Sequence, residues 1–507
     1  MKLCIILFLV NFSAAADILA FMVIPGLSHH RGLSPIFEEL AVEGHNVTVV
    51  TAFPREKPLK NFNEIDISNF TTMHFDSIRK YFPKPFPEMY QIEIILGLFH
   101  NINDVLDKIL EVESVRNAIR SKYDVILVEN ITPLTYVAGI MNRAPIIILS
   151  PAPGWLGGHD ALGNPTHPVL TPNFVLGIEG NPSFFDRLRS TTFNILWRTL
   201  YTYYDLPRCD KIARKHFGEN IPSLAEVQKN TSLALFTHNF VANSIKPTVP
   251  AVVDINLIHI KAKKPLPNDI QEFMDKSKRG VVYFSLGTYE LTYNTTEHRM
   301  SIIREALMSL PYDVLWKYHI DEDMPCNIMV KRWFPQHDVL GHPKLKVFVT
   351  QGGANSIEQA IYETVPMVML PVQGDQGQNA KKMVSMGMAE MLDIFTMTKK
   401  DLTKTITQVA ESQKYKDSAI KQSKILKDQP MKGVKKAVWW VEYVIRHKGA
   451  PHLRSGFLDM PFYQYYLLDV MGFFLLCFFL IMVVFYKMLT YVLSLKKIMC
   501  TKKIKSQ

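Results

Sequence analysis

The sequence predicts an α/β protein with two domains of parallel β-sheet and, near its C-terminal end, one helix that could span a membrane. Short apolar runs rich in β-branched residues alternate almost evenly with segments of helical apolar spacing. The 507 residues exceed what one core usually takes, since a domain commonly has roughly 100–200 residues. Residues 470–486, VMGFFLLCFFLIMVVFY, are apolar over a length close to the roughly 20 residues that cross a bilayer.

The N-terminal end has the features of a secretory signal peptide over 1–16. Lys2 is basic, a short apolar stretch follows, and the small residues Ala14 and Ala16 suit cleavage before Asp17. An uncleaved anchor is the alternative, but the apolar stretch is too short to span a bilayer well. We therefore expect the mature chain to begin at Asp17.

At the other end we expect a juxtamembrane segment over 451–469, a transmembrane helix over 470–490 and a basic cytoplasmic tail over 491–507. A buried core helix is the alternative for 470–490, but only the basic tail follows for it to pack against. Positive charges beside a spanning helix favour the cytoplasmic side. The last residues, KIKSQ, are similar to the Lys-x-Lys-x-x retrieval signal of endoplasmic reticulum membrane proteins. These features predict a single-pass type I protein of that membrane, with its bulk in the lumen.

In the lumen the chain would be a glycoprotein, with acceptor sequons at Asn69, Asn230 and Asn294. Cys209 and Cys326 could pair, but nothing in the sequence demands a disulfide. The net charge of +10 lies largely in the C-terminal tail, and no stripe of Lys and Arg with interleaved aromatic residues occurs elsewhere. We therefore do not expect nucleic acid as a partner.

The predicted first domain, 17–250, opens with a βαβ unit. Its elements are a strand over 17–24, a loop over 25–32, a helix that starts at Ser34 and Pro35 and runs over 36–42, and a strand over 46–51. In such sheets ligands lie beyond the carboxyl ends of the strands, so the loop with His29 and His30 faces the site. A histidine there can act as a general base, because its ordinary pKa lies near working pH. On the residues alone, an exposed loop histidine is the more common alternative.

The remaining elements follow the same alternation. In the first domain we expect helical stretches over 89–119 and 184–217, and buried strands over 125–128, 146–150 and 233–237, the first of them ending at Glu129. A proline- and lysine-rich linker is expected over 251–268. In the second domain, 269–450, we expect strands over 281–286, 328–331, 347–350 and 365–370, a short helix over 270–277 and helical segments over 399–447.

The stretch 346–383, KVFVTQGGANSIEQAIYETVPMVMLPVQGDQGQNAKKM, predicts a strand, a glycine turn, a helix and a second strand. The pair Gly352 and Gly353 lets the backbone approach a ligand closely, and the new helix points free N–H groups at it. Such a helix start attracts an anion by about 0.3–1 kcal/mol, typically a phosphate. A tight turn without a ligand is at least as common, so the glycine pair alone does not decide.

Residues on both sides of this stretch add to it. Together they resemble the signature of UDP-dependent glycosyltransferases, the family of the animal UDP-glucuronosyltransferases and insect UDP-glucosyltransferases. The positions that match its spacing are Trp333, Gln336, Gly352, Gly353, Ser356, Asp375 and Gln376. Two positions depart from the family pattern. Gln351 stands where the family usually has His, and Gln359 stands where it usually has Glu. The neighbouring Glu358 does not replace that glutamate, because on a helix it would point about 100° away. The resemblance implies the GT-B fold, two Rossmann-like domains facing a cleft.

The resemblance also implies roles in binding the donor. Trp333 would stack on uracil, Gln336 would bond uracil or ribose, and Gln359 would accept from a ribose hydroxyl. The residues expected around the diphosphate are Ser285, Gln351, Gly353, Asn355 and Ser356, and Asp375 and Gln376 would hold sugar hydroxyls. A packed core tryptophan is the alternative for Trp333. A glutamine at position 351 can donate a hydrogen bond but carries no charge, which predicts weaker donor binding.

For catalysis, the resemblance places the general base at His29. Ser28 and Pro35 have the family's spacing around it, which favours His29 over His30. Glu129 would orient this histidine, at a place where the family usually has Asp. An exposed residue at a strand end is the alternative for Glu129.

The sequence therefore predicts inverting transfer of a hexose from a UDP-sugar to a hydroxyl of a small lipophilic acceptor, as in detoxification, with no metal and no cofactor besides the donor. Glucose is favoured because residues 459–465 are similar to those of insect members. Aromatic and apolar residues expected near the acceptor are Phe82, Phe86, Tyr90, Leu96 and Phe99. Two alternatives remain: a non-catalytic membrane module, motivated by Gln351 and Gln359, and an enzyme acting on lipid-linked sugars. The oligomeric state stays open, a homo-oligomer included.

Overall fold

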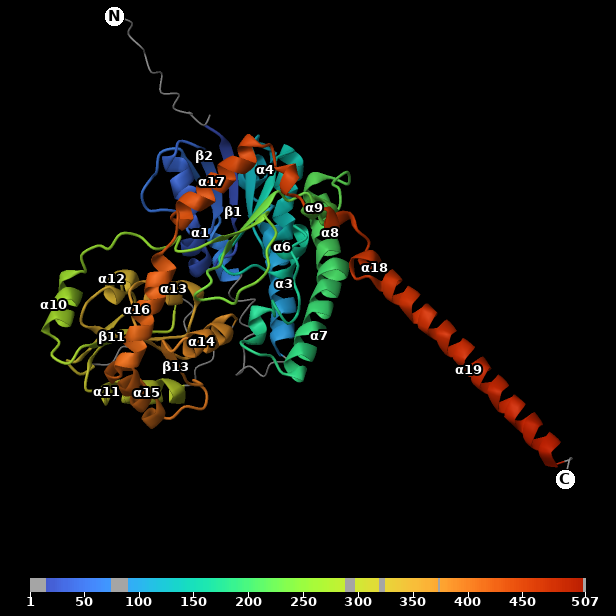
Figure 1. Ribbon diagram of the computed structural model, residues 1–507. Coiled ribbons are helices and arrows are strands. Elements are labelled where there is room, and N and C mark those ends of the chain that lie inside the picture. The colour runs from blue at the N-terminus through green and yellow to red at the C-terminus, as the bar shows by residue number, and fades with distance from the viewer. Residues whose placement is uncertain (1–14, 74–89, 288–296, 319–323, 373, 505–507) are drawn as a thin grey trace, which may run out of the picture. The chain divides into compact units, whose positions relative to one another are not determined.

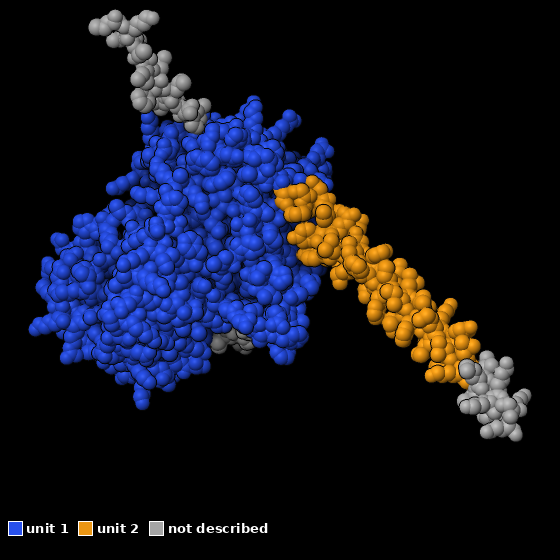
Figure 2. All heavy atoms as spheres, viewed as in Figure 1, with its two compact units in different colours: residues 1–454 blue, residues 455–507 orange. Residues whose placement is uncertain are grey.

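The computed structural model describes residues 15–73, 90–287, 297–318, 324–372 and 374–504. The chain forms two compact units, residues 1–454 and 455–507, which Figure 2 colours separately. The first unit contains two parallel β-sheets with helices packed on both, as the alternation of apolar runs predicts (Figure 1). We call the first sheet with its helices the N-lobe and the second sheet with its helices the C-lobe. The predicted signal peptide lies outside the described residues except for its last two.

The N-lobe sheet has seven strands in the order β3-β2-β1-β4-β5-β6-β7, and all neighbours are parallel. The strands are β1 (Asp17–Met22), β2 (Asn46–Thr51), β3 (Phe62–Asp66), β4 (Val125–Glu129), β5 (Ile146–Ser150), β6 (Leu233–Thr237) and β7 (Val252–Ile255). The central strands are buried on both faces, which explains their continuous apolar runs. β7 lies inside the stretch 251–268 that the sequence assigns to the linker, so the first sheet extends further than expected.

Helix α1 begins at Leu27 and ends at Val42, so its predicted start at Ser34 was wrong. Pro35 lies inside the helix, although proline is most common in a first turn. Its missing N–H costs one intrahelical bond, and the buried residues Leu33, Ile36 and Phe37 pack this segment against the sheet. As a result, His29 and His30 sit in the first turn of a helix and not in a loop.

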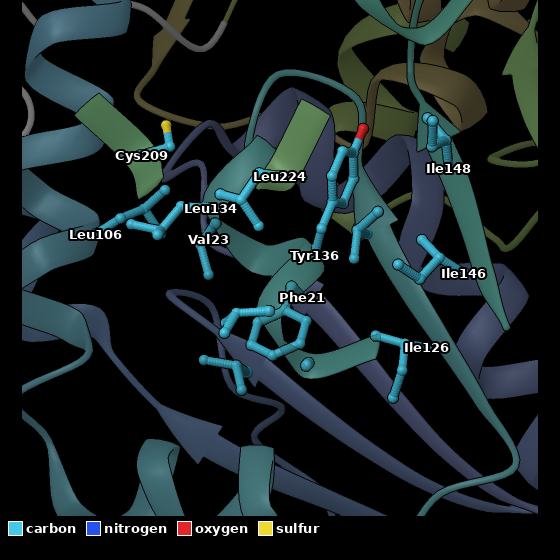
Figure 3. Packing of buried hydrophobic residues seen from close by; sticks show 14 of the residues in the cluster. Phe21, Val23, Leu106, Ile126, Leu134, Tyr136, Ile146, Ile148, Cys209 and Leu224 are labelled. Carbon is cyan, nitrogen blue, oxygen red and sulfur yellow. The ribbon is translucent and has the colours of Figure 1, made fainter. Parts of the chain in front are cut away.

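Helices cover both faces of the N-lobe sheet. They are α3 (Tyr90–Ile109), α4 (Glu113–Arg120), α5 (Val137–Asn142), α6 (Leu156–Ala161), α7 (Phe184–Leu200), α8 (Leu206–Phe217) and α9 (Leu224–Lys229). Figure 3 shows one of the two cores, in which Phe21, Ile126 and Ile148 of the strands meet Leu106, Leu134 and Leu224 of the covering segments. The predicted helical stretch 184–217 is interrupted by a π-helical turn, Tyr201–Asp205, just before Pro207.

The C-lobe sheet has six strands in the order β10-β9-β8-β11-β12-β13. The strands are β8 (Val281–Ser285), β9 (Asp313–Lys317), β10 (Ile328–Lys331), β11 (Leu345–Thr350), β12 (Met367–Met369) and β13 (Ala389–Met391). The helices are α10 (Asn268–Lys276), α11 (Glu297–Met308), α12 (Gln336–Leu340), α13 (Ala354–Tyr362), α14 (Gln376–Ser385), α15 (Lys399–Glu411) and α16 (Gln413–Lys427).

The helix α17 (Gly433–Arg446) returns from the C-lobe to the N-lobe and lies beside α1 (Figure 1). Its buried face, Ala437, Val438, Val441 and Val444, joins the core formed by α1 and the sheet. Gly433 permits this return, because a Cβ there would come within 1.8 Å of the carbonyl oxygen of Asn256. A helix closing back on the first domain is what the family resemblance implies.

The second unit holds α18 (Phe462–Tyr465) and the long helix α19 (Leu468–Ile504). Residues Leu468–Lys496 of α19 contain an apolar window with a mean hydropathy of 2.7, and none of that window is buried within the structure. This is one candidate membrane span among the described residues, and it contains the predicted 470–490.

Candidate active site

The starts of α13 and α14 in the C-lobe face segments of the N-lobe that follow strand ends. Asn355, in the first turn of α13, donates a hydrogen bond from Nδ2 to the carbonyl oxygen of Ser28 at 2.9 Å. Gln378, in α14, donates from Nε2 to the carbonyl oxygen of Ile178 at 3.2 Å. These contacts bring the predicted catalytic residues of one lobe to the predicted donor residues of the other.

His29 and Glu129 form a hydrogen-bonded pair between Nδ1 and Oε1. They meet because β1 and β4 are neighbouring strands, with Glu129 at the end of β4 and His29 just beyond β1. Glu129 is buried, whereas 29% of the His29 side chain is exposed. A carboxylate only accepts, so Nδ1 carries the hydrogen and Nε2 keeps a lone pair. The imidazole can therefore take a proton at Nε2.

The surroundings of His29 raise its pKa above the ordinary 6.5. Burial acts to lower the pKa, but the charge and hydrogen bond of Glu129 and the charge of Asp375 outweigh it. Asp375 comes from the C-lobe, so both lobes favour the imidazolium. His30 differs, because burial lowers its pKa to about 4. Of the two histidines, only His29 has the environment of a general base.

The start of α13 is an open, uncapped helix end. Gly352 has φ of +88°, and a Cβ there would come within 2.7 Å of the Met369 side chain, so this position requires glycine. Gly353 is the N-cap, makes no side-chain cap, and a Cβ there would meet nothing within 4 Å. Among the described residues, the space beside Gly353 is therefore open at the uncapped start of α13, as an anion site needs. The N–H of Ser356 donates to the carbonyl oxygen of Gly353 at 3.0 Å.

Residues predicted to surround the diphosphate lie around this helix start. Ser285 ends β8, which pairs with β11 so that Ser285 lies opposite Thr350. The next residue after Thr350 is Gln351, whose amide covers Gly287, since a Cβ at Gly287 would come within 2.1 Å of Nε2. Ser285 and Gln351 thus share one edge of the sheet with Gly353.

Gln336, Ser356 and Gln359 form a hydrogen-bonded cluster. Gln336 donates from Nε2 to Oγ of Ser356 at 3.0 Å and to Oε1 of Gln359 at 2.8 Å. A carboxylate at position 359 could accept the same bond, so the glutamine keeps one property of the usual glutamate. The structure brings these three predicted residues together.

Two cations that the sequence did not indicate lie over the ring of Trp333. Its side chain is 43% exposed, with the Arg31 guanidinium carbon 4.1 Å and the Lys317 Nζ 4.5 Å from the ring centre. Lys317 also donates to the carbonyl oxygen of Gly287 at 2.6 Å. Lys317 could have been found from the sequence, because it ends β9 and ligands lie beyond strand ends. Arg31 could not, because it reaches the indole from the other lobe.

Asp375 and Gln376 lie at the start of α14, and their neighbours hold them. Asn379 donates from Nδ2 to Oδ2 of Asp375 at 2.6 Å and to the carbonyl oxygen of Gly352 at 3.0 Å. Burial raises the pKa of Asp375, against the lowering by Asn379 and His29. Gln376 is buried, and its Oε1 accepts from the backbone N–H of Val372 at 2.8 Å. Asp375 thus interacts electrostatically with His29, while Oε1 of Gln376 is held by the backbone four residues earlier.

A solvent-open pocket lies between N-lobe loops and α14, with about 630 Å³ of empty space when the adjoining solvent is included. Its apolar wall includes Leu156, Leu170, Pro172 and Phe174, and its polar wall includes His159, Glu179, His238, Lys246, Gln378 and Asn379. Of the residues expected near the acceptor, Phe82 and Phe86 lie outside the described residues. Phe99 packs edge-on against Trp197 at 4.7 Å, so its ring belongs to a core cluster.

A metal centre is not apparent in the part of the chain that the structure describes. No group of three or more His, Cys, Asp or Glu side chains there is placed to hold an ion. Cys209 and Cys326 are both free.

The chain is similar to known proteins in both sequence and fold. A family model described as UDP-glucoronosyl and UDP-glucosyl transferase matches residues 20–505. UDP-glucosyltransferase 2 of Dactylopius coccus is 32% identical over 483 residues, which cover 93% of this chain and 92% of that protein. UDP-glucuronosyltransferase 2B7 of Homo sapiens is 30% identical over 477 residues, which cover 89% and 88%.

Solved structures agree on the fold. Os79 from O. sativa, in complex with U2F and trichothecene, matches with a TM-score of 0.56 at 18% identity, over 84% of this chain and all of that chain (100%). A UDP-glucose: anthocyanidin 3-O-glucosyltransferase in complex with UDP matches with a TM-score of 0.54 at 16% identity, over 86% and 100%. At these identities the likeness shows the fold alone, and it confirms the predicted GT-B arrangement.

Proposed function

Because the chain belongs to the UDP-glycosyltransferase family, whose members transfer a sugar from a UDP-sugar to an acceptor, we propose that it transfers glucose to a hydroxyl of a small lipophilic molecule, with His29 as general base. The pairing of His29 with the buried Glu129, beside Asp375 of the other lobe, carries this proposal.

The proposed reaction is a single displacement. The acceptor hydroxyl gives its proton to Nε2 of His29 as its oxygen bonds to the anomeric carbon. The bond from that carbon to the diphosphate breaks on the opposite face, and UDP leaves with the bonding electrons, which inverts the anomeric configuration. Glu129 stabilises the imidazolium that forms, and general-base help of this kind is typically about 10²–10⁴-fold.

The C-lobe supplies the donor site in this proposal. Uracil would stack on Trp333, an interaction worth about 1–3 kcal/mol per base. The diphosphate would lie at the start of α13, where backbone N–H groups and Ser356 stabilise the leaving group. Lys317, between Gly287 and Trp333, would supply the positive charge that Gln351 lacks. Asp375 would accept from sugar hydroxyls, and no metal or further cofactor takes part in this scheme.

Two observations support the choices of sugar and acceptor. Relatives that share about a third of the sequence include an insect enzyme named a glucosyltransferase, and residues 459–465 resemble the insect members. The pocket between the N-lobe loops and α14 has an apolar wall that includes Leu156, Leu170 and Phe174, which suits a lipophilic acceptor.

We place the two lobes in the lumen of the endoplasmic reticulum. The apolar helix Leu468–Lys496 supports membrane anchoring, and the basic tail after it supports a cytoplasmic C-terminus. Protease protection of a tagged chain in sealed microsomes tests this orientation: the lobes should survive digestion while the tail is removed.

The test of the function uses the full chain in detergent. Turnover of UDP-glucose and UDP-glucuronic acid is measured on a panel of phenolic acceptors, for the wild type and for His29→Ala, with UDP affinity measured by calorimetry. We expect faster turnover with UDP-glucose, and a loss of about 10²–10⁴-fold in kcat for His29→Ala with UDP affinity kept. Equal rates for the two proteins would remove His29 from the mechanism.

Binding of a UDP-sugar without transfer is the second candidate function. The neutral side chains of Gln351 and Gln359 favour it, since both positions usually carry a titratable group in the family. UDP binding by the wild type with no turnover on the whole acceptor panel would support this function over the first.

A further inference from the structure

Glu358 is a buried carboxylate in the donor helix α13 that points away from the donor residues. It is 3% exposed, and both of its oxygens accept hydrogen bonds from segments that follow N-lobe strands. Oε1 accepts from Nδ2 of Asn239 at 2.6 Å, and Oε2 accepts from the backbone N–H of Leu257 at 3.1 Å. Asn239 follows β6 and Leu257 follows β7. One side chain therefore ties the donor helix to two N-lobe segments.

The orientation of Asn239 makes this bond specific. Its Oδ1 accepts from the backbone N–H groups of Val241 and Ala242, at 3.1 and 2.6 Å. Those two bonds fix the amide so that Nδ2 faces Glu358. Asn239 is itself buried, so its N–H needs an acceptor at this place. The side-chain N–H of Asn239 therefore requires an acceptor at position 358, and Glu358 provides one.

His259 holds the same turn of α13 from another side. Its Nε2 donates to the carbonyl oxygen of Asn355 at 3.0 Å, and burial lowers its pKa to about 4, so the ring is neutral. Within the described part of the chain, the bare Nδ1 has no hydrogen-bond partner, and it lies 3.7 Å from Oε2 of Glu358. Burial raises the pKa of Glu358 to about 7, so a proton on the carboxyl would face that nitrogen.

The same turn of α13 also contacts the N-lobe segment that contains His29. The side chain of Asn355 donates to the carbonyl oxygen of Ser28, which directly precedes His29. A hydrogen-bonded path therefore runs from His259, through Asn355, to the first turn of α1, and Glu358 is connected to it through the backbone of α13. Any shift of α13 against the N-lobe would move the diphosphate site relative to the base.

We propose that Glu358 is a positioning residue for the transfer reaction, which sets the start of α13 against the segment that carries His29. This inference rests on the proposed role of His29 as base. Because displacement of a reacting group by about 1 Å can cost roughly 10²-fold in rate, a shift at this contact affects kcat first. UDP binding is affected less, because the residues proposed to hold UDP lie in the C-lobe.

The experiment exchanges the donor and the acceptor of the hydrogen bond between Asn239 and Glu358. In E358Q the new amide nitrogen must face either Asn239 or Leu257, both of which present N–H groups, so one bond is lost. In N239D/E358Q the new carboxylate accepts from the new amide nitrogen, and the amide oxygen still accepts from Leu257. The new carboxylate also keeps the bonds to Val241 and Ala242. E305Q, at an exposed position of α11, is the control.

Three readouts decide the role of Glu358: kcat and KM, UDP affinity by calorimetry, and hydrogen exchange of peptides that cover residues 24–33. For E358Q we expect a fall in kcat of roughly 10- to 100-fold, faster exchange of that segment and near-normal UDP affinity. The exchanged pair should restore kcat and exchange in large part. Wild-type kcat and exchange in E358Q, or a loss that extends equally to UDP affinity and is not restored, would overturn the proposal.

The two proposals fail separately. If the wild type turns over and E358Q equals it, the positioning role fails and the proposed function stands. If the wild type turns over no acceptor, the proposed function fails, and the exchange of residues 24–33 still decides whether Glu358 holds that segment.

Discussion

The substitution Glu129→Gln tests the electrostatics of the proposed base most directly. The glutamine has the same length and can still accept from Nδ1 of His29, but it carries no charge. The pKa of His29 is raised only because the charge and hydrogen bond of Glu129, with the charge of Asp375, outweigh burial. Without the Glu129 charge, burial should prevail and the pKa should fall below its ordinary 6.5.

Two effects on the rate follow from this change. Proton transfer turns His29 into an imidazolium, and the variant no longer offers it a charged partner. A hydrogen bond to a charged group contributes about 1.5–3 kcal/mol, which corresponds to roughly 10- to 150-fold in kcat at the pH plateau. Because the base titrates at lower pH, the acidic limb of the profile should also move to lower pH. The variant is therefore slower, but it keeps its activity further into acid.

The assay measures kcat/KM for the UDP-sugar as a function of pH, with the phenolic acceptor at a saturating concentration. It compares the wild type, E129Q and the control E113Q. Glu113 is exposed at the start of α4. The wild-type limb should lie above pH 6.5, since the pKa of His29 is raised, and E113Q should match it. An unchanged limb in E129Q would refute the pairing as the source of the raised pKa. A limb that moves to higher pH would refute the sign of the argument.

Four further predictions concern the donor site. Gly352→Ala should lower the melting temperature by roughly the equivalent of 1–3 kcal/mol, because φ is +88° and the methyl would meet Met369. Gly353→Ala should leave melting unchanged but raise KM for the UDP-sugar several-fold, since its Cβ enters open space at the helix start; equal effects at both positions would contradict this. Gln351→His should lower that KM by roughly a few-fold through a charge-assisted bond, measured at pH 6 against pH 8; a gain that is independent of pH would speak against charge. Trp333→Ala should weaken UDP binding by roughly 5- to 150-fold in calorimetry, and unchanged affinity would exclude stacking.

The parts of the fold that the sequence predicted best are the strands buried on both faces. The predicted bounds of β5 and β6 agree with the structure, because a central parallel strand is one continuous apolar run. The predicted bounds of β2 and of the edge strand β10 agree as well. The edge strand β3, Phe62–Asp66, was missed because its sequence FNEID is mostly polar and half exposed. β7 was missed because prolines flank it, and these indicated a linker.

The residues of the candidate site also divide into those that the sequence could group and those that it could not. Residues that follow neighbouring strands of one sheet could be grouped from spacing, as Ser285 and Gln351 show. Contacts between the lobes could not, because they join distant parts of the chain through side-chain geometry. Asn355 and Ser28 are 327 positions apart, and nothing in either local sequence indicates the other. Arg31 on the face of Trp333 is a second contact of this kind.

The two departures from the family pattern can be understood together as a balance of charge at the diphosphate. A histidine that can be positive and a glutamate that is negative are both replaced by neutral glutamines, Gln351 and Gln359. The sum of the two charges near the leaving group is therefore close to that of a charged His–Glu pair. The carboxylate that α13 does carry, Glu358, lies one position before Gln359 and faces the N-lobe, where Asn239 and Leu257 bind it. A site in decay would lose such groups independently, whereas here one neutral pair replaces a mutually compensating one, and Gln359 still accepts the bond from Gln336. That balance favours a working donor site over a relic.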